Sequence, residues 1–200
     1  MSIFQFENCL PFDGELYLQR AFYSPEQADT YFEKFVETLD WQQEQLRLYG
    51  RYISVPRLIA WYGDREAHYR YSGVDHMPKP WTQELLHVKI DLDALLKSNF
   101  NSVLANLYRD GRDSMGCHAD NEPELGANPL IASLSFGETR LLRFRHQQTK
   151  HKFDIDLKHG DLLIMVGTLQ EHWRHELPKT LSHKHARINL TYRQINCLQS

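Results

Sequence analysis

The segment KFDIDLKHGDLLIMV, residues 152–166, carries the clearest signal of fold class in the chain. Phe153, Ile155 and Leu157 alternate with aspartates, and such alternation is typical of a strand that has one face in water. The turn signal HGD follows at residues 159–161, and a further run of apolar residues begins directly after it. This part of the chain therefore predicts neighbouring β-strands joined by a short turn.

The same alternation of apolar and polar residues extends outward from this segment through the second half of the chain. Further turn signals are Asp110-Gly111 and Gly137-Glu138. The expected strands are Val103–Tyr108, Ile131–Phe136, Arg140–His146, Lys152–Leu157, Asp161–Val166 and Ala186–Arg193. Several short strands at this spacing predict a sandwich or a jelly roll.

The first hundred residues show helical periodicity instead. Ser24, Pro25 and Gln27 form a helix start with a capping box. The apolar residues that follow at helical spacing are Ala28, Tyr31, Phe32, Phe35, Val36 and Leu39. A second helix is expected from about Trp81 to Lys97, with an apolar stripe of Leu85, Leu86, Val88, Ile90, Leu92 and Leu95. The fold class expected is mainly β, with a jelly-roll core buttressed by these N-terminal helices.

Length and composition limit the class of protein. Two hundred residues, 42% hydrophobic and 24% charged, without repeats or linkers, predict one globular domain over residues 1–200. A net charge of −3 excludes a protein that is held on nucleic acid mainly by bulk positive charge. The three cysteines form no CxxC pair, so a reducing compartment is expected. With no signal peptide and no membrane span recognised, a cytoplasmic monomer is predicted.

The motif His118-Ala119-Asp120 follows the first predicted strand. In extended chain, residues two apart point to the same face, so both side chains can reach one metal ion. A further histidine would complete a 2-His-1-carboxylate triad, which leaves open positions on iron(II). The alternative is a pair of exposed side chains without a ligand.

The last predicted strand places Arg187, Asn189, Thr191 and Arg193 on one face. Arginine has a planar fork that suits a carboxylate, so two arginines on an inner face indicate an anionic ligand. On an earlier strand, Asn106 and Tyr108 have the same spacing and could point into the same cavity. The alternative is a solvated outer face with ordinary salt bridges.

These motifs together resemble the AlkB family of iron(II)- and 2-oxoglutarate-dependent dioxygenases. The similarity spans Tyr49 to Ile195 and includes HxD, a later histidine in His175-Glu176-Leu177-Pro178, and RxNxxxR from Arg187. The resemblance implies a double-stranded β-helix over residues 101–196, preceded by helical support and a nucleotide-recognition lid over residues 1–100.

The resemblance also implies a set of ligands. Iron(II) would be held by His118, Asp120 and His175, and Arg193 would grip the distal carboxylate of 2-oxoglutarate. The same pocket would be lined by Asn106, Tyr108, Arg187 and Thr191. Spacing alone leaves other candidates for the third iron ligand, which are His172, His146, His159 and His183. Cys117, beside His118, is expected to be a small buried residue.

The lid would lie in residues 48–57 and 61–64. By resemblance, Tyr62 would stack on a flipped base, and Asn121 and Glu122 would contact the same base. The turn Tyr49-Gly50-Arg51 would contact the nucleic-acid strand. Tyr49 is predicted to enter a duplex as a wedge. The alternative is a surface hairpin whose aromatic residues pack on the helices.

The activity implied is oxidative demethylation of N-alkylated bases such as 1-methyladenine and 3-methylcytosine, with release of formaldehyde and succinate. The partner would be alkylated DNA, single- or double-stranded, or RNA. Basic residues in segments 140–152 and 179–185 could contact phosphates or form a solvated face. The alternatives are a dioxygenase acting on a protein or a small molecule, and a noncatalytic jelly-roll binding module.

Overall fold

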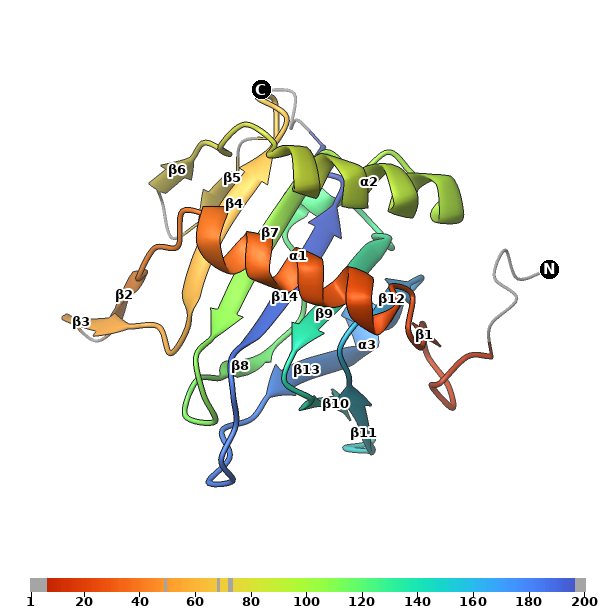
Figure 1. The fold of residues 1–200 in the computed structure, drawn as a ribbon. Helices are drawn as coiled ribbons and strands as arrows, with labels where there is room; N and C mark the ends of the chain where they lie inside the picture. Colours follow the sequence, from red (N-terminus) through yellow and green to blue (C-terminus); the bar gives the residue numbers. More distant parts are fainter. Residues whose placement is uncertain (1–6, 49, 68, 72–73, 197–200) are drawn as a thin grey trace.

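The structure is a computed structural model that describes residues 7–48, 50–67, 69–71 and 74–196 (Figure 1). Its framework is a six-stranded major sheet in the order β1-β12-β9-β14-β7-β4, in which every neighbouring pair is antiparallel. The strands are β1 (Glu15–Gln19), β4 (Leu58–Gly63), β7 (Ser102–Tyr108), β9 (Ile131–Gly137), β12 (Leu162–Val166) and β14 (Arg187–Arg193). The arginine strand β14 is therefore central, paired with β7 on one side and β9 on the other.

A four-stranded minor sheet, ordered β11-β10-β13-β8, faces the major sheet. Its strands are β8 (Met115–His118), β10 (Arg140–His146), β11 (Lys152–Leu157) and β13 (Trp173–Leu177). The short helices η1 (Pro123–Leu125) and α3 (Leu169–His172) connect strands of the two sheets. Two small hairpins, β2 (Gln45–Leu48) with β3 (Arg51–Ser54) and β5 (Tyr69–Tyr71) with β6 (Val74–His76), lie to one side in Figure 1. This arrangement confirms the predicted jelly roll.

Helices α1 (Pro25–Thr38) and α2 (Gln83–Leu96) cover the outer face of the major sheet (Figure 1). The predicted capping box is present, because Ser24 accepts from the backbone N–H of Gln27 and the Gln27 side chain accepts from that of Ser24. Phe35 of α1 and Leu92 of α2 are fully buried against this face of the sheet. Helix packing therefore leaves the opposite face of β14 free to line the space between the sheets.

A second hydrophobic cluster fills most of the space between the two sheets. Its side chains come from β1, β7, β9 and β12 of the major sheet and from β10, β11 and β13 of the minor sheet. The largest of them is Trp173, which is fully buried. A polar cavity opens within this otherwise apolar interior, so the polar residues there are held by a rigid frame.

Several details differ from the sequence-based expectation. In α2 only part of the predicted apolar stripe is buried. Leu85, Val88 and Leu92, which recur at the helical period, face the sheet and are buried, whereas Leu86, Ile90 and Leu95 are exposed. Val36 of α1 is also exposed. Cys117 is exposed rather than buried, since β8 is an edge strand with its outer face in water. None of the described helices is long and apolar enough to cross a membrane.

Candidate active site

Strand pairing in the minor sheet brings His118 and His175 together. The two residues are directly opposite each other in the β8–β13 ladder, and their ring centroids are 4.3 Å apart. Asp120 follows β8 and turns its carboxylate toward both rings, so ligand atoms of all three residues lie within 4.8 Å of one another. The structure thus assembles the three residues predicted as iron ligands.

The protonation of the two rings suits metal binding. Nδ1 of His118 is 2.8 Å from the carbonyl oxygen of Gly116, so it can donate its proton there and leave Nε2, 3.4 Å from Asp120, available as a ligand. Burial, together with the neighbouring His118, lowers the pKa of His175 to about 3. His175 is therefore neutral at physiological pH, as a metal ligand has to be.

Asp120 is held at the centre of this cluster with 2% of its surface exposed. Its backbone N–H donates to Oε1 of Gln170 at 2.9 Å, and its Oδ2 accepts from Nη2 of Arg193 at 3.0 Å. Burial alone would raise the pKa of Asp120, but Arg193 and the two histidines hold it well below its usual range. Asp120 is therefore a carboxylate, and the cluster combines one anion with two imidazoles, of which the ring of His175 is neutral.

The polar cavity begins at these three residues and extends along the inner faces of β14 and β7. Its walls include the inward-facing side chains of β14, which are Arg187, Asn189, Thr191 and Arg193, and those of Asn106 and Tyr108 from β7. The alternation predicted for the last strand is therefore confirmed, since Ile188, Leu190 and Tyr192 pack on the helix side. All five residues predicted to bind 2-oxoglutarate line this one cavity.

Arg187 lies at the end of the cavity away from the histidines and is only 2% exposed. Its Nη2 donates to Oγ of Ser135 at 2.8 Å, its guanidinium carbon lies 5.4 Å from the ring centroid of Tyr108, and its Nε has no hydrogen-bond partner. Burial lowers the pKa of Arg187 to about 10, so the group is still charged at neutral pH. Within the described part of the chain no carboxylate pairs with it.

Arg193 donates to Asp120 at the histidine end of the cavity, and its predicted contact with the distal carboxylate of 2-oxoglutarate stays a prediction. Register places it at this end, because Arg193 lies opposite Ser102 at one end of β7 while Arg187 lies opposite Tyr108 at the other end. Of the two arginines, Arg187 is the one without an acidic partner and remote from the metal ligands.

The other histidines considered as third ligand lie elsewhere. His159 pairs with Asp29, and His183 contacts His185 in the loop before β14. His146 and His172 are near each other and near Asp13, in a separate cluster. Among the described residues, only His175 joins His118 and Asp120.

The residues predicted to contact a substrate fall into three groups. Tyr62 is 5% exposed within the helix-side core, and its hydroxyl oxygen accepts from the backbone N–H of Asp40, so it does not present a face to a base. Arg51 is exposed on β3, next to a tight turn in which Gly50 has a φ of 79°. Asn121 is exposed and Glu122 half-buried directly after Asp120. Tyr49 lies outside the described residues.

Sequence reasoning missed three residues that support the site. Gln170 holds the backbone of Asp120, Ser135 accepts from Arg187, and Arg57 donates to Oδ1 of Asn106 at 2.7 Å. Arg140 is buried and donates to the backbone carbonyls of residues 110, 113 and 178, so it serves the structure rather than a phosphate. Each role depends on a contact between distant parts of the chain, for which the sequence carries no local signal.

Comparison with known proteins identifies the family. Residues 15–193 match the family model described as the 2OG-Fe(II) oxygenase superfamily. The chain is 39% identical over 185 residues to the bovine "Alpha-ketoglutarate-dependent dioxygenase alkB homolog 3", with 88% of this chain and 64% of that protein covered. It is 37% identical over 180 residues to the human "DNA oxidative demethylase ALKBH2", with 84% of this chain and 69% of that protein covered.

The fold has a counterpart among solved structures. "The structure of OsALKBH1" superposes with a TM-score of 0.63 at 16% identity, covering 92% of this chain and 99% of the other, which shows a shared fold. The chain spans about two-thirds of the length of the alkB homolog 3 proteins that it matches. From the family match and the two groups of relatives, this chain belongs to the AlkB family within the 2OG-Fe(II) oxygenase superfamily.

Proposed function

We propose that this protein is an iron(II)- and 2-oxoglutarate-dependent dioxygenase that removes alkyl groups from nucleic-acid bases by oxidation. The observation that carries the proposal is the buried cavity with a 2-His-1-carboxylate cluster at one end and the unpaired Arg187 at the other. Relatives whose names specify an alpha-ketoglutarate-dependent dioxygenase and a DNA oxidative demethylase support it.

The residues present fit both cofactors. Two imidazoles and one carboxylate form the ligand set that iron(II) takes in non-haem oxygenases, and Arg193 keeps the carboxylate ionised and oriented. Arg187 is a buried cation that lacks an anion, and a carboxylate entering the cavity would supply it. We therefore propose that His118, Asp120 and His175 hold iron(II), while Arg187, rather than Arg193, pairs with the distal carboxylate of 2-oxoglutarate.

When bound together, iron(II) and 2-oxoglutarate supply the oxidising chemistry with O2, and the protein orients the reactants. Asn106, Tyr108 and Thr191 would complete the 2-oxoglutarate pocket by hydrogen bonding around the carboxylate. The apolar side chains between the sheets exclude bulk water from this cavity, which strengthens the contact with Arg187. Oxidation of an N-methyl group to an unstable hydroxymethyl group would then release formaldehyde and restore the base.

The surface around the cavity supports a nucleic-acid partner. On the outer face of the minor sheet Arg145 lies directly opposite Arg174 on one side and Lys152 on the other, which forms a row of three cations across β13, β10 and β11. Like charges in such positions destabilise a sheet, and the acids near this row are Glu176, 3.8 Å from Arg145, and Asp154, whose pKa is lowered mainly by Arg143 and also by Lys152. We propose that phosphates neutralise this row, which ends beside β8, the strand that carries His118.

The β2–β3 hairpin adds an exposed apolar surface. Tyr52 is 70% exposed and Ile53 50% exposed, so the hairpin presents apolar side chains to solvent that a partner would cover. We propose that the hairpin contacts the nucleic acid, with Arg51 near phosphate and Tyr49 as a wedge in duplex DNA. The Tyr49→Ala variant should lose more activity on a methylated duplex than on the same lesion in a single strand. Equal losses on both would contradict the wedge.

The test of the function is a screen of methylated oligonucleotides as DNA and RNA, single- and double-stranded, with mass spectrometry of the bases. The proposal expects 1-methyladenine or 3-methylcytosine to be restored only when iron(II), 2-oxoglutarate and O2 are all present. Restoration in RNA alone would establish the second candidate, an RNA dealkylase. Turnover of 2-oxoglutarate with no effect on any base would point to a protein or a small molecule as substrate. A cytoplasmic location and a monomeric state stay predictions.

A further inference from the structure

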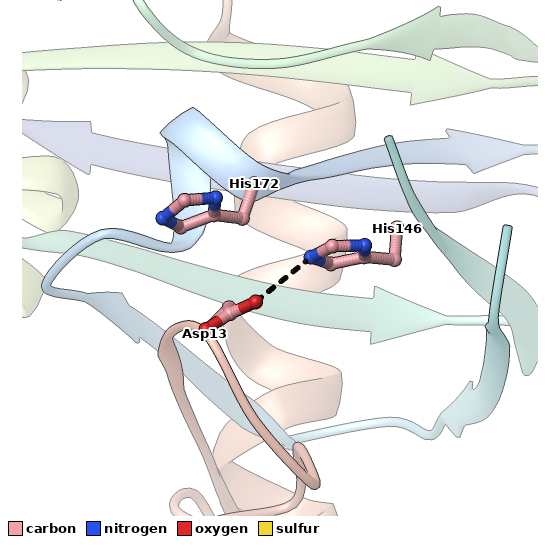
Figure 2. A group of neighbouring side chains, drawn as sticks. All are labelled: Asp13, His146 and His172. Carbon is pink, nitrogen blue, oxygen red and sulfur yellow. Dashed lines mark ion pairs between the residues drawn. The ribbon is translucent and has the colours of Figure 1, made fainter. Parts of the chain in front are cut away.

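A second cluster of metal-binding side chains lies outside the cavity. Asp13, His146 and His172 offer one carboxylate and two imidazoles whose ligand atoms lie within 4.8 Å of one another (Figure 2). They come from three separate elements, which are the loop before β1, the end of β10 and the end of α3. The proposed dioxygenase function uses none of them.

His146 is the least exposed member of the cluster. Its side chain is 1% exposed, and its Nε2 makes no hydrogen bond of normal geometry, although Oδ2 of Asp13 lies 3.2 Å away. Its Nδ1 accepts from the backbone N–H of Thr149 at 3.1 Å, so the ring proton of the neutral form is on Nε2. The buried Nε2 of His146 therefore points at the carboxylate of Asp13, which is itself half exposed to solvent.

The carboxylate is held toward His146 by its neighbours. Trp173 donates from Nε1 to the backbone oxygen of Phe12 at 3.2 Å, and the Phe12 ring meets His146 edge-on with centroids 5.1 Å apart. His172 closes the third side, with its ring nearly parallel to that of His146 at an interplanar angle of 13°. The convergence of the three side chains is thus built by packing rather than by a chance meeting of surface residues.

We propose that Asp13, His146 and His172 form a second metal site, which takes Zn²⁺ or a similar transition-metal ion and is separate from the iron site. Zn²⁺ binds imidazole and carboxylate at about 2.0–2.2 Å, so its tetrahedral ligand atoms are roughly 3.3 Å apart. The Asp13–His146 pair already has that spacing, and the half-buried His172 needs only a small shift to join it. A nitrogen and oxygen donor set favours such an ion over Mg²⁺ or Ca²⁺.

Metal binding requires the other tautomer of His146. The ring proton moves from Nε2 to Nδ1, where Oγ1 of Thr149, 3.0 Å away, can accept it at the expense of the bond from the Thr149 N–H. Such an outer acceptor is usual for metal-bound histidines. Occupancy would fix α3, which also holds Gln170 against the backbone of Asp120 and precedes His175 in the chain. The second metal would thus stabilise the segment next to the iron ligands.

The experiment counts zinc on the full chain. Protein stripped with a chelator is titrated with ZnCl2 alone in a calorimeter, and the metal that remains after desalting is counted by elemental mass spectrometry. Wild type should bind two equivalents, since the iron site also accepts Zn²⁺. The variants Asp13→Asn and His172→Gln should each lose one equivalent, with at least ~100-fold weaker binding at the second site. His175→Ala should lose the other.

His151→Gln is the matched control, because His151 also contacts Phe12 but lies outside the cluster, and it should keep both equivalents. Binding of one equivalent of zinc by wild type, or of two equivalents by both Asp13→Asn and His172→Gln, would overturn the proposal. Asp13 is exposed on a loop, so Asp13→Asn keeps the test decisive even if His172→Gln fails to fold. Because the readout is zinc rather than demethylation, failure here is distinguishable from failure of the proposed function.

Discussion

Arg187 and Arg193 lie on the same face of β14, and both are buried, yet their surroundings are opposite. Arg193 donates to Asp120 and is neutralised by a residue of the protein. Arg187 has a serine, an aromatic ring and another arginine around it, and in the described chain no acid pairs with it. A buried charge is costly without a partner, so the difference separates an arginine that is paired within the protein from one that we propose to pair with an anionic ligand.

The largest expected effect concerns the metal end of the cavity. The variant His175→Ala should lower turnover by about a thousand-fold or more, because even outer-shell changes at metal sites cost roughly 10–100-fold. The matched control is His183→Ala, which removes another histidine that was considered as third ligand but lies in the loop before β14, outside both clusters. Iron retention and succinate release should both be measured. Normal turnover by His175→Ala would show that the third ligand lies elsewhere.

The next effect concerns Arg193. Replacing it with Met should destabilise the metal-free protein by about 3–5 kcal/mol, because Asp120 is left buried without its cation. Added iron(II) or Mn²⁺ should restore much of this loss, since the metal supplies the missing positive charge. Chemical denaturation with and without metal measures both the loss of stability and its restoration. A variant as stable as wild type without metal would mean that the Arg193–Asp120 pair contributes little.

Arg187→Met should behave in the opposite way. It removes a buried charge that has no acidic partner in the described structure, so the metal-free protein should lose no stability. The contact with the distal carboxylate is worth about 1.5–3 kcal/mol, so the KM for 2-oxoglutarate should rise by roughly tenfold or more. Thermal shift on adding 2-oxoglutarate, large in wild type, should nearly vanish. A larger effect of Arg193→Met on this KM would show that Arg193, rather than Arg187, pairs with the distal carboxylate.

The smallest effect tests a residue outside the cavity. Tyr62→Phe removes the oxygen that accepts from the Asp40 N–H and should cost about 1 kcal/mol of stability. Activity on methylated oligonucleotides should be unchanged, because the ring is in the helix-side core. The midpoint of thermal unfolding and the rate of demethylation are the two measurements. Wild-type stability together with a loss of activity would return Tyr62 to the substrate site.

Helices and strands were predictable where the spacing of apolar residues and the turn residues indicate the same element. Arg140–His146 and Lys152–Leu157 are strands with the predicted bounds, because each alternates between the interior and water. Strands β1, β8 and β13 were not predicted, since they are short and take their strand geometry from pairing with distant partners. Helix α2 was predicted, but three apolar residues of its predicted stripe are exposed, and only the packing shows which ones.

The site was predictable as a set of residues but not as an arrangement. His118 and Asp120 follow from the geometry of extended chain, and the alternation of β14 predicts its polar face. His175 was selected by the family resemblance, because the β8–β13 register that brings it to His118 has no local signal. Which arginine meets Asp120 depends on the same kind of long-range register, so the contact of Arg193 with Asp120 was not predictable, and its predicted contact with 2-oxoglutarate stays a prediction.

In the proposed function, one cavity couples oxidation of 2-oxoglutarate to restoration of a methylated base. The most direct measurement follows succinate and restored base together in one reaction containing iron(II), 2-oxoglutarate, O2 and a 3-methylcytosine oligonucleotide. Equal amounts of the two products, both reduced in parallel by Arg187→Met at limiting 2-oxoglutarate, are the predicted result. Succinate formed without restored base, or a restored base that does not require 2-oxoglutarate, would contradict it.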